Sequence, residues 1–103
     1  MNTEKMRATA SQVSDLMKVL SHENRLMVLC LLAEAERSVG ELARLLDVRE
    51  QAMSQQLARL RAEGLVTTRR EGQTIHYRLA RDDVRALVAF IYATYCGDEA
   101  RGH

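Results

Sequence analysis

The stretch that decides the fold runs from Ser38 to Gly64 and reads SVGELARLLDVREQAMSQQLARLRAEG. Ser38 stands three residues before Glu41, which is the spacing of a capping box at the start of a helix. Apolar residues at helical spacing follow, with a break at Asp47 and a renewed helical pattern that ends at Gly64. Two short helices joined by a turn of a few residues form a helix-turn-helix, which we expect at about 38–63.

The segment after Gly64 interrupts the helical pattern. β-branched and aromatic residues cluster between 65 and 79 around a polar turn segment at 70–73, which predicts a β-hairpin, the wing. A last helix is expected at about 82–96, since the carboxylates of Asp82 and Asp83 suit a helix N-terminus. Its apolar stripe from Val84 to Tyr95 has no evident partner within so short a chain.

Two more helices are predicted before Ser38. Apolar positions between Met6 and Leu20 indicate the first helix, and the second is expected at about 22–34 with Ser21 as its N-cap. The second helix is apolar almost all round, which is typical of a central helix. The predicted fold class is therefore mainly α with a small β-hairpin: a winged helix-turn-helix with four helices, a hairpin and a fifth helix.

The length of 103 residues and the 47% hydrophobic content favour a single domain over residues 1–103. Only 4% of the residues are aromatic, so the core is thin and dimerisation is expected to supply further burial. The longest apolar stretch, 26–33, is too short to cross a bilayer, and the N-terminus lacks the apolar core of a secretory signal. We therefore expect a cytoplasmic protein with no membrane partner.

The charges are unevenly distributed, although the net charge is only +1. Arginines crowd the predicted second helix of the helix-turn-helix and the wing, which favours contacts with phosphates. Gln and Ser side chains on the polar face of that helix suit base edges in a major groove. Such a face is often merely solvated, but its place between a capped helix and a wing favours DNA binding. The expected DNA contacts are Arg49, Gln51, Ser54, Gln55, Arg59, Arg69, Arg70 and Gln73.

The order and spacing of these motifs resemble the ArsR family of bacterial repressors. The resemblance covers about residues 13 to 96 and rests on segments 20–26, 38–42, 53–57 and 64–66. It implies a homodimer built on the first and last helices, at about 6–19 and 82–96. It also implies that the helix at about 50–63 enters the major groove of double-stranded operator DNA, with the wing on flanking phosphates.

Many members of this family sense metals, but the ligand sets that the resemblance would imply are missing. Segment 41–47 reads ELARLLD and holds no cysteine, and the last helix has no histidine before His103. Two thiols without further N or S ligands make a poor zinc site. We expect neither a metal nor another cofactor, and a metal- or metalloid-responsive repressor remains the alternative.

The two cysteines, Cys30 and Cys96, fall on the predicted second and last helices. In a cytoplasmic protein, reduced thiols, metal ligands or redox sensors are favoured over a structural disulfide, and each cysteine taken alone is better explained by packing. Together they resemble the BigR/SqrR branch of the family, and a HlyU-like branch carries a similar pair. The resemblance implies a sensor in which persulfide or polysulfide converts the pair to a disulfide or polysulfide bridge that weakens operator binding. A general thiol-redox regulator that responds to peroxide is a further alternative.

An enzyme is the opposing class. The sequence holds no Cys-His pair of recognisable spacing, no glycine-rich phosphate loop and no acidic pair in an evident cleft. The sequence therefore predicts a DNA-binding regulator without catalytic residues.

Overall fold

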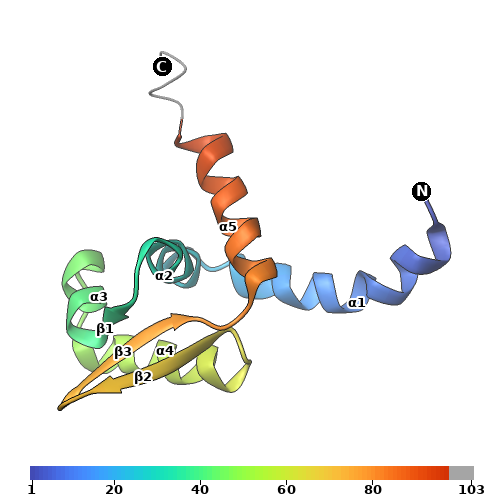
Figure 1. Ribbon diagram of the computed structural model, residues 1–103. Helices are drawn as coiled ribbons and strands as arrows, with labels where there is room; N and C mark the ends of the chain where they lie inside the picture. Colours follow the sequence, from blue (N-terminus) through green and yellow to red (C-terminus); the bar gives the residue numbers. More distant parts are fainter. Residues whose placement is uncertain (98–103) are drawn as a thin grey trace.

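The computed structural model describes residues 1–97. His103 lies outside the described residues. The chain forms five helices and three short strands in the order α1 (Thr3–Leu20), α2 (Glu23–Glu34), β1 (Arg37–Ser38), α3 (Val39–Leu46), α4 (Glu50–Ala62), β2 (Val66–Glu71), β3 (Thr74–Leu79) and α5 (Asp82–Tyr95). Figure 1 shows α3 and α4 beside the β2–β3 hairpin, with α1 and α5 leading away from them. The predicted winged helix-turn-helix is confirmed.

Helix α2 lies at the centre of the domain, packed against α1, α3, α5 and β3. Its residues Val28, Leu29 and Leu32 are buried. This follows from a helix with apolar side chains on nearly every face, which must be covered on several sides. The core continues into the other elements through Leu42, Met53, Leu57, Leu60, Val84 and Val88.

The start of α3 is fixed by the predicted capping box. The Ser38 backbone N–H donates to Glu41 Oε1 at 2.9 Å, and the Glu41 N–H donates to Ser38 Oγ at 3.2 Å. The bond from the Ser38 backbone is the main cause that lowers the pKa of the Glu41 carboxyl. At the other end of α3, Asp47 has a left-handed backbone with φ 54° and turns the chain toward α4.

The strands form one antiparallel sheet in the order β1-β3-β2. Strand β1 was not predicted from the sequence. It consists of Arg37 and Ser38 alone, paired with Tyr77 and His76, and two residues are too few to show a strand period. The predicted turn at 70–73 is also too long: Glu71 pairs with Thr74, so the turn is Gly72–Gln73, with Gly72 at φ 63°.

Ser21 does not cap α2 as predicted. Its side-chain hydroxyl donates to the carbonyl of Lys18 at 2.7 Å, so it closes the end of α1 instead. The N-cap residue of α2 is His22, which makes no side-chain capping bond. A serine between two helices satisfies whichever helix end its local backbone favours, and here that is the C-terminus of α1.

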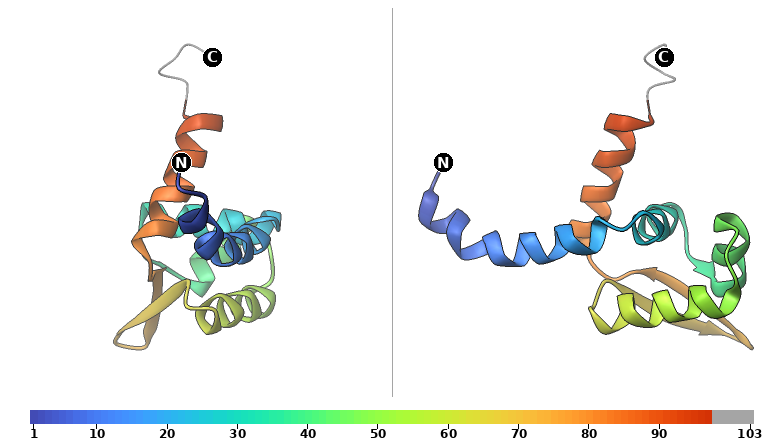
Figure 2. Two further views of the ribbon diagram at one scale, coloured as in Figure 1. Left: turned by 90° about the vertical axis from the view of Figure 1, so that its right-hand side faces the viewer. Right: turned by 180° about the vertical axis from the view of Figure 1, so that it is seen from behind.

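Helices α1 and α5 project from the domain in different directions (Figure 2). Both carry apolar side chains that no described part of the chain covers. Phe90 is 65% exposed and Tyr95 is 75% exposed on α5, and Met6, Val13 and Met17 are exposed on α1. Among residues 1–97, no helix is both long and apolar enough to span a membrane.

Candidate DNA interface and cysteine pair

Helix α4 presents one buried and one solvent-facing side. Met53, Leu57 and Leu60 are fully buried and fix the helix on the core. Gln51, Ser54 and Gln55 are exposed, at positions that alternate with the buried ones in the helical period. Three polar side chains of the kind that read base edges are thus held on a rigid helix.

The predicted phosphate-binding residues surround this face of α4. Arg49 is the exposed N-cap residue of α4, and Arg59 is exposed in its last turn. Arg69 and Arg70 lie on β2, and Gln73 occupies the turn at the wing tip. The structure therefore places all eight predicted contacts on α4, its N-terminus or the wing.

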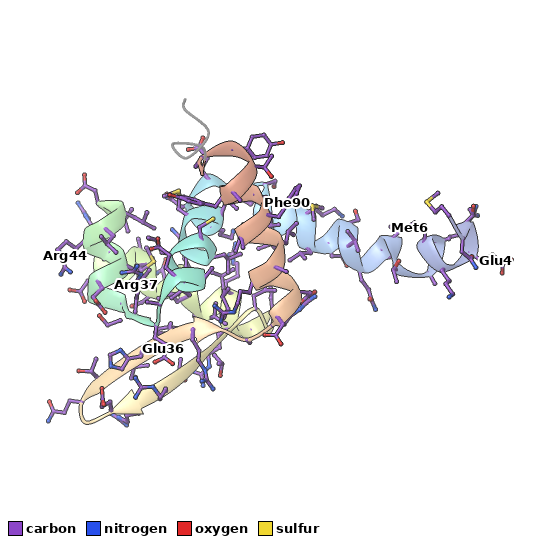
Figure 3. All side chains as sticks on the ribbon, turned by 45° about the horizontal axis from the view of Figure 1, so that its top comes forward. Glu4, Met6, Glu36, Arg37, Arg44 and Phe90 are labelled. Atoms are coloured by element: carbon purple, nitrogen blue, oxygen red, sulfur yellow. The ribbon has the colours of Figure 1, made fainter. Side chains whose placement is uncertain are left out.

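The two arginines of β2 differ in their surroundings. Arg69 Nε donates to Glu36 Oε1 at 2.9 Å, and Arg78 Nη1 lies 3.9 Å from Glu36 Oε2. Glu36, labelled in Figure 3, precedes β1. Arg70 is exposed and has no ion pair in the part of the chain that the structure describes. Because Glu36 already binds the Arg69 guanidinium, Arg70 is the more available cation of the two.

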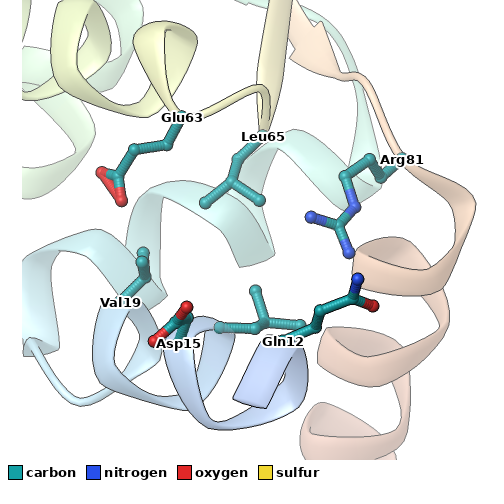
Figure 4. A pocket seen from close by; sticks show the side chains of 7 residues that line it. Gln12, Asp15, Val19, Glu63, Leu65 and Arg81 are labelled. Carbon is teal, nitrogen blue, oxygen red and sulfur yellow. The ribbon is translucent and has the colours of Figure 1, made fainter. Parts of the chain in front are cut away.

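A pocket of about 230 Å³ lies where α1 leaves the domain. Figure 4 shows the carboxylates of Asp15 and Glu63 on one side of it, together with Val19, and the Arg81 guanidinium and Gln12 amide on the other. Arg81 is already bound to Asp83 by two hydrogen bonds. These bonds hold the pKa of the Asp83 carboxyl below its usual range. The Arg81 guanidinium, at the start of α5, is therefore already bound to a carboxylate.

The two cysteines lie on neighbouring elements. Cys30 is partly buried on α2, and Cys96 is exposed directly after α5, at its C-cap. Both are free thiols. Burial raises the pKa of the Cys30 thiol, and the nearby charges of Cys96 and then Glu34 raise it further. The packing of α2 against α5 thus brings the two thiols within electrostatic reach of each other.

The side chains that could bind a metal ion are scattered over the described residues. Up to Gly97, no three His, Cys, Asp or Glu side chains come together in a group that could hold a metal ion.

The comparisons with known proteins agree with this architecture. Residues 22–68 match the family model described as bacterial regulatory protein, arsR family. Over 94 residues the chain is 48% identical to the biofilm growth-associated repressor of Agrobacterium fabrum, covering 91% of this chain and 80% of the relative. The chain belongs to the ArsR family.

Two further relatives come from other bacteria. The chain is 41% identical to the transcriptional activator HlyU of Vibrio cholerae, over 93% of this chain and 89% of HlyU. The crystal structure of the transcriptional repressor BigR from Xylella fastidiosa superposes with a TM-score of 0.85 at 43% identity, over 93% of this chain and 98% of that one. This ArsR-family protein is a transcriptional regulator, similar in fold and sequence to BigR and HlyU.

Proposed function

We propose that this ArsR-family regulator is a homodimeric repressor that binds operator DNA and is released when Cys30 and Cys96 are oxidised by persulfide or polysulfide. The observation that carries the DNA-binding part is the exposed polar face of α4, between the capped α3 and a wing whose Arg70 has no ion pair among the described residues. Base contacts come from Gln51, Ser54 and Gln55. Phosphate contacts come from the ends of α4 and from the wing.

The dimer follows from the uncovered faces of α1 and α5. A chain that leaves Phe90 and Tyr95 largely exposed has apolar surface that a second copy can bury. The whole chain then acts as one unit, with dimerisation helices at about 6–19 and 82–96, a helix-turn-helix at about 38–63 and a wing at about 65–79. Two α4 helices related by a two-fold axis fit two half-sites of double-stranded DNA, which places the activity in the cytoplasm with the chromosome.

Sensing begins at the exposed thiol of Cys96, because Cys30 is partly buried and this burial raises the pKa of its thiol, which disfavours the reactive thiolate. The Cys96 thiolate attacks the sulfane sulfur of a persulfide RSSH, which forms the Cys96 persulfide and releases the thiolate RS⁻. The Cys30 thiolate then attacks the Cys96 sulfur, forms the disulfide and expels HS⁻. Two thiols lose two electrons, and the transferred sulfur is reduced to sulfide.

A longer bridge forms when both cysteines are first converted to persulfides by two RSSH molecules. The terminal sulfur of one persulfide then attacks the cysteine sulfur of the other and expels HS⁻, which leaves a trisulfide. Either bridge ties α2, the central helix, to the end of α5, a dimerisation helix. Release of DNA requires a coupling of only about 1 to 3 kcal/mol between the two sites.

The experiment compares the wild type with Cys30→Ser and Cys96→Ser. Each protein is exposed separately to polysulfide, hydrogen peroxide and zinc, and then analysed by intact-mass spectrometry and by its affinity for a DNA duplex that the reduced wild type selects from random sequences. We expect both variants to bind this duplex like the reduced wild type and to keep that affinity after polysulfide. The wild type should lose affinity while its mass falls by two hydrogen atoms for the disulfide, or rises by one sulfur atom less two hydrogen atoms for the trisulfide.

Three results would contradict the proposal. Loss of DNA affinity in polysulfide-treated Cys96→Ser would exclude the two-cysteine mechanism. Release by peroxide with no response to polysulfide would favour a general thiol-redox regulator. Release by stoichiometric zinc from the reduced protein would favour a metal-responsive repressor.

A further inference from the structure

A second pocket, of about 260 Å³, lies between the start of α2 and one flank of α4. It is lined by Arg25, Ala52, Gln55, Gln56 and Arg59. Four of the five residues come from a single stripe of α4 at helical spacing, and Arg25 faces them from α2. The pocket therefore joins the central helix to the helix that carries the predicted base contacts.

The charged residues that line this pocket are both arginines. It is lined by two guanidinium groups, and among residues 1–97 no carboxylate lines it. Neither Arg25 nor Arg59 forms an ion pair or a side-chain hydrogen bond within that range, although Arg25 is partly buried. Two arginines without an anion beside a partly enclosed space form a site suited to a phosphate group.

Gln56 supplies an independent observation. Its side-chain oxygen Oε1 is buried and accepts no hydrogen bond in the described part of the chain. A buried acceptor without a donor is costly, and the guanidinium groups that line the same pocket are strong donors. One N–H of a guanidinium can bond Gln56 Oε1 while others bond an anion, so Gln56 can hold an arginine in position for that anion.

The position of the pocket identifies the anion. Gln55 lines the pocket and also belongs to the exposed face of α4. A helix with its side chains is about as wide as the major groove, roughly 10 to 12 Å. Side chains on the flank of a helix in that groove therefore meet the phosphates at its edge.

We infer that Arg25 and Arg59, oriented by Gln56, bind a backbone phosphate of the operator at the edge of the groove that α4 occupies. Arg25 adds a DNA contact from α2, outside the helix-turn-helix and the wing. The inference rests on the proposed DNA-binding function and extends the interface to the helix that carries Cys30. One helix then holds both a sensor thiol and a phosphate contact, five residues apart in the sequence.

The test compares Arg25→Gln and Arg59→Gln with Lys18→Gln, which removes the same charge from an exposed site on α1. Affinity for the duplex selected by the wild type is measured over a series of salt concentrations. Each arginine variant should bind about five- to tenfold more weakly and lower the slope of log affinity against log salt by about one. Lys18→Gln should change neither quantity.

A second measurement locates the contact. Single phosphates of the duplex are replaced in turn by neutral methylphosphonates, and the wild type should lose affinity at each phosphate that it contacts. At one of these positions per half-site, Arg25→Gln should lose less affinity than the wild type when the phosphate is neutralised, because only Arg59 still contacts it. A variant weakened only through misfolding would keep the sensitivity of the wild type at every position.

The outcomes separate the inference from the proposed function. If the wild type selects no duplex, the proposed function fails and the inference falls with it. If the wild type binds DNA but a folded Arg25→Gln keeps its affinity, salt slope and phosphate sensitivity, only the inference is overturned. Should Arg25→Gln fail to fold, the exposed Arg59→Gln decides by the same criteria.

A small phosphorylated compound carries the same chemistry as the DNA backbone. Inorganic phosphate is therefore titrated into the free protein while the Nε–H signals of the arginines are followed by NMR. Phosphate binding that Arg25→Gln abolishes without any effect on DNA affinity would assign the site to a small ligand and overturn the DNA contact.

Discussion

The DNA-facing half of the molecule consists of α3, α4 and the wing, and the two arms are α1 and α5. The two parts differ in how far their apolar side chains are buried. The inner side chains of α4 are fully buried within one chain, whereas Phe90 and Tyr95 on α5 are mostly exposed. The first half is held by its own core. The second presents apolar surface that nothing in residues 1–97 covers, so stability and assembly should respond to different substitutions.

The largest effect is expected from Leu57→Ala in α4. Leu57 is fully buried, and removal of such a side chain costs about 2 to 5 kcal/mol through lost burial and the cavity left behind. Urea unfolding should show this loss at every protein concentration. Tyr95→Ala on the arm is the matched control, and an equal loss there would contradict the contrast between the two halves.

Phe90→Asp should weaken the dimer without unfolding the domain. A charge in place of a buried interface aromatic costs about 2 kcal/mol, or roughly a thirtyfold increase in the dimer dissociation constant. Sedimentation equilibrium measures this constant. Ile75→Asp, at an exposed apolar residue of the wing, should leave it unchanged, and a dimer that tolerates Phe90→Asp would place the interface elsewhere.

Ser38→Ala should cost about 1 kcal/mol of unfolding free energy, because it removes one of the two capping bonds of α3. Thermal unfolding monitored by circular dichroism checks the value. The Lys18 carbonyl that accepts the Ser21 hydroxyl also accepts the Ser21 backbone N–H, so Ser21→Ala leaves one bond in place and should have a smaller effect. The reverse order would show that the cap of α3 does not fix the DNA-facing half.

Acid sensitivity should depend partly on Glu41. Its pKa is lowered in the folded protein, so its contribution to stability is complete above the ordinary glutamate pKa and is lost as the pH falls below about 4. Glu41→Gln keeps an acceptor for the Ser38 N–H but does not titrate. The variant should therefore lose less unfolding free energy than the wild type between neutral and acid pH. Equal losses in both proteins would show that Glu41 does not contribute to the acid sensitivity.

The smallest expected effect distinguishes the two arginines of the wing. Arg70→Gln should weaken DNA binding several-fold and lower the salt slope by about one, as expected for one lost phosphate contact. Arg69→Gln should change binding less, because Glu36 already holds its guanidinium. Gel-shift titrations with the selected duplex decide the order, and a larger effect of Arg69→Gln would show that the pair with Glu36 opens on DNA.

Local signals predicted the elements of this fold. The capping box at Ser38 and Glu41 and the apolar spacing of α4 involve neighbours in sequence, and these elements formed as expected. Ser21 was assigned to the wrong helix, because a serine between two helices can satisfy either end. Strand β1 was missed because its pairing depends on the free edge of β3, about forty residues away in the chain.

The candidate site was predictable only in part, for the same reason. The exposed polar face of α4 follows from its helical period, and the structure keeps it exposed. The bond between Glu36 and Arg69 joins residues 33 positions apart, and the pocket of Arg25 and Gln56 joins two separate helices. Neither the bond nor the pocket has a signal in the local sequence. Tertiary packing alone shows which arginines already bind a carboxylate and which are available to DNA.

Strand β1 has a mechanical consequence. Ser38 pairs with His76 of the wing and at the same time caps α3, so a tilt of the wing pulls directly on the first turn of that helix. The same residue therefore links the wing to the helix-turn-helix, and we expect a displacement of the wing to be transmitted to α3 and, through it, to the DNA-facing surface.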